Sequence, residues 1–185
     1  MTKRHDDGRL RDANGQYAID PAANQVPTGL LTQTELPHRQ HIQSVCKEAG
    51  LEMMVGVFEV IDDREEVATV AFQRVTTDDI DGFYDEFIGP AVDKIEAELV
   101  RDNPNEDDFP TADLDAVRTH LHQVSDEAGL DVMKGFFDVL VDRETIADDV
   151  LTGVTVEHVE AFYSWRVAPA IGQVQNSLSA TSDRF

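Results

Sequence analysis

The sequence predicts an all-α protein, built as a tandem duplication of a four- to five-helix unit with an extended N-terminal arm. Residues 39–99 align without a gap to residues 118–178, and 22 of the 61 aligned pairs are identical. Ordinary residue usage would give roughly four identities by chance. Within each copy, apolar residues recur at helical spacing between glycines and prolines. We therefore expect two similar helical units in one chain.

These observations divide the chain into five segments. The arm is 1–34, the first helical repeat 35–100, an acidic linker 101–112, the second repeat 113–178 and a C-terminal tail 179–185. The arm has few large apolar residues, so it cannot form a core by itself. An Asn14-Gly15 pair predicts a small hairpin within it. The linker lacks the ligand pattern of a calcium loop, which favours a solvated connection.

The first two helices of each repeat follow from the apolar pattern. The first is expected at about 35–49 and ends before Gly50, a residue suited to a left-handed helix end. The second is expected at 52–61 and again at 131–141, where the chain is apolar almost all round. This pattern is typical of a buried central helix. Because β-branched residues are dense there, a strand is the alternative.

A third helix is predicted to start at the recurring Asp-Arg-Glu triplet. Asp63 and Asp142 are expected to cap helices at about 64–74 and 143–151. This triplet is the only polar one kept in both copies.

The next helix is predicted to start at a recurring threonine. Thr76 and Thr155 are expected to cap it, over about 77–88 in the first copy and 156–167 in the second. Pro90 and Pro169 then kink that helix or open a fifth segment.

Four residues of the repeat are candidate structural anchors. Arg64 and Arg143 are either buried anchors that bridge the two copies or part of a helix cap with a local ion pair. Phe83 and Phe162, each followed by tyrosine, are interpreted as core residues and not as part of a ligand site.

The charge composition indicates a protein adapted to high salt. The chain has 37 acidic and 15 basic residues, only four of them lysine, and a net charge of −22. Such dispersed charge repels itself at low ionic strength and is screened in molar salt. The composition resembles that of haloarchaeal cytoplasmic proteins and of viruses that infect haloarchaea. A mesophilic acidic interaction protein is the alternative.

Several classes of partner and chemistry are disfavoured. The acidic body argues against direct binding of nucleic acid and of anionic membranes. No transmembrane segment and no secretory signal core is expected. Glu35 and His38 have the spacing of a di-metal bundle motif, but their counterparts Leu114 and Val117 cannot complete it. We therefore predict no metal, no cofactor and no catalytic residues.

A short stretch of the arm resembles a viral sequence. Residues 11–17, Arg-Asp-Ala-Asn-Gly-Gln-Tyr, resemble the Arg-Asp-x-x-Gly-x-aromatic stretch near the N-termini of many tailed-phage proteins, including structural ones. The resemblance covers seven residues, and Gln16 replaces the arginine expected before the aromatic residue. It implies a virus component and transfers no site residues. Separately, Arg11 and Tyr17 of the arm are candidate contacts to other subunits.

The C-terminal part of the second copy is the clearest candidate interface. Asp85, Glu86, Asp93, Glu96 and Glu98 of the first copy all have uncharged counterparts in the second. Loss of charge next to tryptophan and arginine is typical of an interface core. The predicted contact residues here are Trp165, Arg166, Ile171, Val174 and Leu178.

These features together predict a non-enzymatic structural or assembly protein of a halophilic system. Its most concrete form is a component of a tailed archaeal virus particle, near the head, portal or tail, that contacts self or other protein subunits. The alternatives are a haloarchaeal cytoplasmic adaptor or regulator with one protein partner, including an acidic nucleic-acid mimic, and a metal-binding helical bundle enzyme. The expected location is the virion or the haloarchaeal cytoplasm, with high salt required.

Overall fold

The chain divides into two units, Met1–Leu36 and Pro37–Phe185. The computed structural model describes residues 3–4, 10–11, 37–103 and 113–182. In the first unit, β1 (Lys3–Arg4) pairs antiparallel with β2 (Leu10–Arg11). The Asn14-Gly15 turn predicted from the sequence lies outside the described residues, and the described pairing lies upstream of it.

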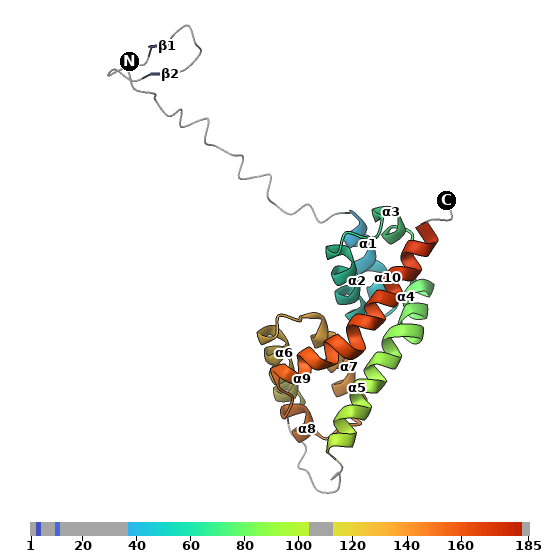
Figure 1. Ribbon diagram of the computed structural model, residues 1–185, viewed down its shortest axis with the longest axis vertical. Helices are drawn as coiled ribbons and strands as arrows, with labels where there is room; N and C mark the ends of the chain where they lie inside the picture. Colours follow the sequence, from blue (N-terminus) through green and yellow to red (C-terminus); the bar gives the residue numbers. More distant parts are fainter. Residues whose placement is uncertain (1–2, 5–9, 12–36, 104–112, 183–185) are drawn as a thin grey trace. The chain divides into compact units, whose positions relative to one another are not determined.

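In the second unit, which we call the body, every regular element of the described residues is a helix, as the all-α prediction expects (Figure 1). Its first half contains α1 (Pro37–Glu48), α2 (Met53–Asp63), α3 (Thr69–Phe72), α4 (Thr77–Phe83), the π-helical segment η1 (Tyr84–Ile88) and α5 (Gly89–Asp102). Its second half contains α6 (Leu114–Glu127), α7 (Val132–Arg143), α8 (Asp148–Thr152), α9 (Val156–Phe162), η2 (Tyr163–Val167) and α10 (Ala168–Ser182). From α2 onward, each element of the second half starts 79 residues after its counterpart.

The apolar second segment of each half is a helix, and the alternative of a strand is wrong. Helices α2 and α7 pack against each other at the centre of the body. Two glycines lie at this contact, Gly56 and Gly135. A Cβ atom on Gly135 would lie 2.7 Å from the Cβ of Met53, and one on Gly56 would lie 3.4 Å from Val132. The close packing of the central helices therefore depends on glycine at position 135.

The third helix of each half is shorter than predicted and starts later. Glu65 and Glu144 have positive φ angles of 53° and 50°, a conformation that an α-helix cannot contain. Asp63 is consequently the last residue of α2 and Asp142 lies in the last turn of α7, so the prediction that they cap the next helix is wrong. The helices α3 and α8 follow Ala68 and Ala147 instead.

The fourth helix begins at the predicted threonine in both halves. At Thr76 the hydroxyl accepts a hydrogen bond from the Asp79 backbone N–H, and Asp79 accepts one from the Thr76 N–H. At the equivalent place in the second half, the Thr155 N–H donates to Nδ1 of His158 at 3.2 Å. Both helix starts therefore have a side chain that satisfies a backbone N–H left over by the first turn.

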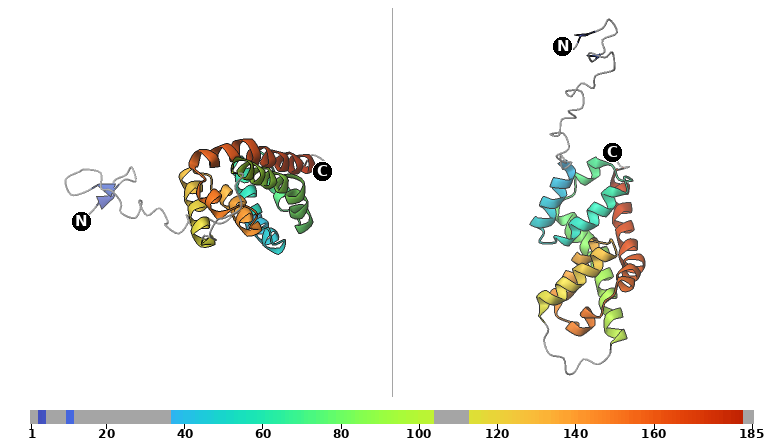
Figure 2. Two further views of the ribbon diagram at one scale, coloured as in Figure 1. Left: turned by 90° about the horizontal axis from the view of Figure 1, so that it is seen from below. Right: turned by 90° about the vertical axis from the view of Figure 1, so that its left-hand side faces the viewer.

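Each long closing helix packs on the opposite half of the body. Helix α10 contacts α2, α3 and η1 of the first half, whereas α5 contacts α7, α8 and η2 of the second half. Figures 1 and 2 show α10 running beside the first half of the chain. Consequently the described core is one cluster with residues from both halves. The two predicted repeats are thus parts of one unit and not separate domains.

The apolar face of α10 is directed into this shared core. Ile171, Val174 and Leu178 are buried, as are Val92, Ile95 and Leu99 at the equivalent places of α5. The helical spacing of these apolar residues therefore correctly predicted the helix. The prediction that Ile171, Val174 and Leu178 contact another subunit is wrong, because the chain itself covers them while the body is folded.

The two repeat arginines, Arg64 and Arg143, each connect one half of the body to the closing helix of the other half. Arg143 lies on α7 and makes ion pairs with Asp93 at 2.6 Å and Glu96 at 3.1 Å, both on α5. The hydrogen bond to Asp93 raises the pKa of Arg143 further above its ordinary value. Arg64 follows α2 and donates to Oε1 of Gln175 on α10 at 3.1 Å. Both arginines bridge the halves as predicted in one of the two interpretations, although both lie at the surface.

The repeat phenylalanines pack as core residues. Phe162 is buried and its ring meets that of Phe137 edge to face, with centroids 6.5 Å apart. Phe83 is partly buried and meets Phe58 in the same way at 6.3 Å. The equivalent contacts agree with the prediction that these residues stabilise the fold.

Candidate functional site

Trp165 is the most exposed large hydrophobic residue of the described chain. Its side chain is 71% exposed, and Val70 at 46% is the other large hydrophobic side chain left exposed there. Full exposure of tryptophan is unfavourable, since burying such a ring stabilises a protein by about 2–3 kcal/mol or more. Trp165 is therefore the leading candidate for a contact with another molecule.

A π-helical turn before a proline places Trp165 at the surface. The Ala168 N–H donates to the Tyr163 carbonyl five residues back, and the next residue is Pro169. Proline has no N–H and its ring crowds the carbonyl four residues earlier, so an ordinary α-turn is disfavoured at this point. The same wide turn occurs before Pro90, from Gly89 to Tyr84. Such turns are frequent at functional sites.

Trp165 borders a groove of about 500 Å³, which we call the Trp165 groove. One wall comes from α8, α9 and η2 of the second half, and the other from the end of α5 of the first half. The lining residues are Glu98, Leu99, Arg101, Asp102, Asn103, Asp149, Val150, Gly153, Val154, His158, Ala161, Phe162, Trp165 and Arg166. The groove therefore exists only because α5 packs on the opposite half.

Arg166 joins the two walls of the Trp165 groove. Its Nε donates to Oε1 of Glu98 on α5 at 2.8 Å, and its Nη2 contacts the same oxygen. Both side chains are partly buried. Arg166 is thus held beside Trp165 by a charge-assisted hydrogen bond, which is stronger than one between neutral groups. Its predicted role as an interface residue stays a prediction, and its shown role is to fasten α5 to η2.

His158 has a defined hydrogen-bonding state in the same groove. Its Nδ1 accepts the Thr155 N–H, so the neutral ring carries its proton on Nε2. The ring stacks on Phe162 with centroids 6.3 Å apart. Together with Trp165, these rings give the groove an aromatic character.

The first half contains the equivalent groove without the aromatic edge. It has about 250 Å³ and is lined by Val70, Ala71, Arg74, Val75, Asp79, Phe83, Leu178 and Thr181. Every one of these residues is the repeat counterpart of a residue that lines the Trp165 groove. The counterparts of Trp165 and Arg166 are Glu86 and Phe87. The two grooves therefore lie at equivalent places of the two halves, and the Trp165 groove of the second half is the larger one.

The surface around Trp165 changes sharply in charge. The exposed residues of α8 and α9 include Asp149, Glu157 and Glu160, and neither helix contains lysine or arginine. On α10, by contrast, no described residue is charged. The exposed positions of this helix are Pro169, Gln173, Asn176, Ala180 and Thr181. Trp165 therefore lies between an acidic surface and an uncharged one.

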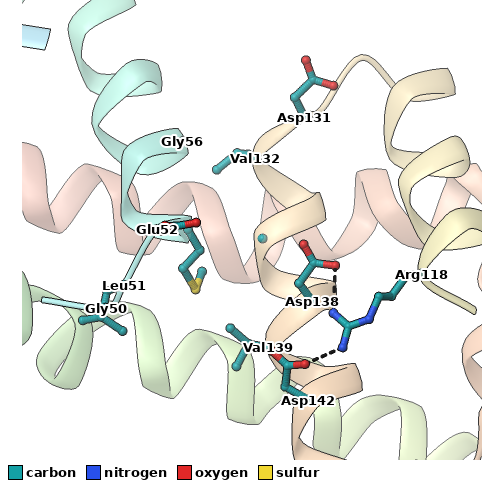
Figure 3. A pocket seen from close by; sticks show the side chains of 12 residues that line it. Gly50, Leu51, Glu52, Gly56, Arg118, Asp131, Val132, Asp138, Val139 and Asp142 are labelled. Carbon is teal, nitrogen blue, oxygen red and sulfur yellow. Dashed lines mark hydrogen bonds and ion pairs between the residues drawn. The ribbon is translucent and has the colours of Figure 1, made fainter. Parts of the chain in front are cut away.

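A second cavity of about 560 Å³ lies between α2 and α7 (Figure 3). Arg118 reaches into it between Asp138 and Asp142, at 3.6 Å and 2.5 Å. The hydrogen bond to Asp142 raises the pKa of Arg118 above its ordinary value. Arg118 therefore holds two of the carboxylates that line the cavity in an ion-pair network, which connects α6 to α7.

The histidines of the described residues have structural partners. His41 and His120, which are repeat counterparts, each bond through Nε2 to a backbone carbonyl, of Val75 and Val154, at 2.8 Å. His38 is buried and lies 2.8 Å from Oδ1 of Asp62. This His38–Asp62 pair was missed in the sequence, because the equivalent positions, Val117 and Val141, are apolar and the repeat gives no signal for it.

The described residues also bear on metal binding, on membrane insertion and on the arm contacts. In the described part of the chain, no group of three or more His, Cys, Asp or Glu side chains is placed to hold a metal. None of the described helices has the length and apolar character needed to span a bilayer. Of the two arm contacts, Arg11 lies in β2, while Tyr17 lies outside the described residues.

Glu98, Asp149 and His158 belong to the Trp165 groove but were missed as site residues. They come from three separate elements. They lie close together because α5 packs on the opposite half, and the amino-acid pattern contains no signal for that packing.

Comparison with protein-family models, with curated proteins and with solved structures finds no match for this chain. Its function is therefore inferred from its own residues, and the Trp165 groove is the site that they favour.

Proposed function

We propose that this chain is a non-enzymatic assembly protein of a halophilic system, which binds another protein subunit through the Trp165 groove. The observation that carries the proposal is the 71% exposure of Trp165 beside a helix whose described residues are uncharged. In a chain of net charge −22, an aromatic and uncharged surface is the exception. Surfaces of this kind are typical of protein interfaces, where tryptophan often supplies the largest contribution to binding.

High salt is part of this proposal. Ion pairs between exposed charges weaken in molar salt, where the screening length is about 3 Å, whereas burial of apolar surface is retained or strengthened. A tryptophan contact is therefore suited to association at high ionic strength. The most concrete version is a component of a tailed archaeal virus particle. It is supported by the resemblance of residues 11–17 to the N-terminal stretch of tailed-phage proteins.

The proposal is tested by the mass of the particles that the chain forms in molar KCl, measured by light scattering over a range of protein concentrations. The variant W165E gives the second half the residue that the first half has at this place, Glu86. We expect the wild-type chain to assemble and W165E to need at least about tenfold higher concentration, which corresponds to a loss of about 1.4 kcal/mol.

The matched control is V70D, which removes the other exposed hydrophobic side chain and gives the first half the residue of the second, Asp149. V70D should assemble like the wild type. A wild-type chain that stays monomeric at every concentration, or equal assembly of W165E and wild type, would contradict the proposal.

A further inference from the structure

The outer face of α10 carries a row of exposed residues in line with Trp165. Trp165, Pro169, Gln173, Asn176 and Ala180 follow one another at intervals of three or four residues, and all are exposed. Residues at this spacing lie on one face of a helix. In both views of Figure 2, α10 lies along the edge of the body, with the other described helices on one side of it. We call these five residues the α10 stripe.

The α10 stripe differs in charge from the equivalent positions of the first half. Its residues are all uncharged, whereas those positions include Glu86, Lys94 and Arg101. In a contact between two copies about a twofold axis, a residue at the axis faces its own copy, so a charged residue there meets a like charge. Of these two equivalent faces, only the α10 stripe can therefore pair with itself without repulsion between its own side chains.

Two pairs of opposite charges are bonded beside the α10 stripe. Arg64 and Glu66 both bond to the side-chain amide of Gln175, and Arg166 bonds to Glu98. Each pair has one positive and one negative member, so these groups add no net charge next to the stripe. In molar salt the screening length is about 3 Å, and the more distant acidic surfaces of two copies repel each other little. Two copies can therefore approach through this face.

The size of the α10 stripe suits a reversible contact. Helix α10 has 15 residues, which makes it about 22 Å long. A buried tryptophan contributes about 150–250 Å². Two such helices and two tryptophans would bury on the order of 900 Å², which is the size of a transient interface. We therefore expect a dimer that dissociates on dilution.

We propose that two copies of this chain pair through their α10 stripes about a twofold axis that passes beside Gln173. The inference rests on the proposed assembly function and names the partner and the geometry of its contact. Gln173 is the middle residue of the stripe, so a contact that uses the whole stripe places it opposite its own copy. Its amide both donates and accepts hydrogen bonds and can pair with the same amide of the second copy. The two helices run antiparallel, because their opposite end charges then lie side by side, and Trp165 covers Ala180 of the second copy.

A cysteine at the proposed axis tests the contact directly. The native Cys46, the only cysteine of the chain, is buried and contributes no accessible thiol. In Q173C, two thiols meet at the axis and come within the distance that a disulfide needs. The matched control K94C places a thiol at the equivalent exposed position of the first half. Under mild oxidation in molar KCl, Q173C should form a disulfide-linked dimer at least about tenfold faster than K94C, measured by electrophoresis without reductant.

Charge variants at the same position test the twofold symmetry. Q173E and Q173K each place like charges across the axis, so each should need about tenfold higher concentration to dimerise, measured by light scattering in molar KCl. A mixture of the two should dimerise like the wild type, because glutamate then faces lysine. The control K94Q changes the net charge by the same amount as Q173E and should behave like the wild type. Circular dichroism of each variant checks that its body is folded.

Three results would overturn the inference: equal cross-linking of Q173C and K94C, charge variants that dimerise like the wild type, or no rescue on mixing. The last would mean that Gln173 faces a different residue and that the contact is not twofold. If W165E dissociates the assembly while Q173E and Q173K do not, the proposed function survives and only the geometry of the contact is wrong. If W165E has no effect on assembly, the proposed function itself fails.

Discussion

The two halves of the body have closely similar backbones and different surfaces. They share the apolar residues of the central helices, the wide turn before proline and the arginines that reach the opposite half. They differ on the outer face of the closing helix, where Asp93, Lys94, Arg101 and Asp102 of α5 correspond to Gly172, Gln173, Ala180 and Thr181 of α10. Shared positions therefore maintain the fold, and the candidate site lies where the halves differ.

The largest expected effect is a loss of stability. It distinguishes the buried face of α10 from the Trp165 groove beside it. Val174 is fully buried, so V174D places a carboxylate among apolar side chains without a partner. We expect a loss of more than about 4 kcal/mol in the free energy of unfolding, enough to abolish a cooperative transition. W165E, by contrast, should change it by about 0.5 kcal/mol or less.

Urea unfolding followed by circular dichroism in molar KCl measures both variants. A stable V174D body, or a strongly destabilised W165E body, would show that the assignment of core and surface on this side of the molecule is wrong.

A smaller effect distinguishes the two central glycines. At Gly135 a Cβ atom would lie 2.7 Å from Met53, whereas at Gly56 the nearest atom lies at 3.4 Å, on Val132. We expect G135A to destabilise the body by about 1–3 kcal/mol, because the close contact forces the helices apart. G56A should be near neutral, since alanine is favoured over glycine in helices by up to about 1 kcal/mol. Equal unfolding midpoints for the two variants would contradict this asymmetry.

At neutral pH the smallest effect concerns Cys46 and its counterpart Ser125, both buried. Burial raises the pKa of the Cys46 thiol to about 12, from an ordinary value of 9.0. The thiol therefore stays neutral in the folded state while it ionises in the unfolded state. Its contribution to stability is complete below about pH 9 and is lost as the pH rises toward 12, by about 1.4 kcal/mol per pH unit.

The variant C46S introduces the residue of the second half, whose hydroxyl donates to the Leu121 carbonyl at 2.8 Å. Unfolding free energies measured from pH 8 to 10.5 should decline more steeply for the wild type than for C46S. Parallel curves would mean that the thiol ionises as readily in the folded state.

Much of the helical framework could be predicted from local patterns. The apolar spacing of Val92, Ile95 and Leu99 identified a buried helix face, and Thr76 identified a helix start, because both signals depend on residues within one or two turns. The third helices were predicted too long. Their late start depends on positive φ angles at Glu65 and Glu144, and glutamate gives no sequence signal for that conformation.

The sequence by itself determined the all-α fold, the acidic surface and the exceptional position of Trp165, since composition and periodicity are local properties of the chain. Only the tertiary structure decided what Trp165 borders. Exchange of α5 and α10 between the halves buries Ile171, Val174 and Leu178, and it brings Glu98 to Arg166 across the groove. The sequence could not show whether the apolar face of α10 is buried within the chain or against a partner, because both kinds of burial select the same side chains.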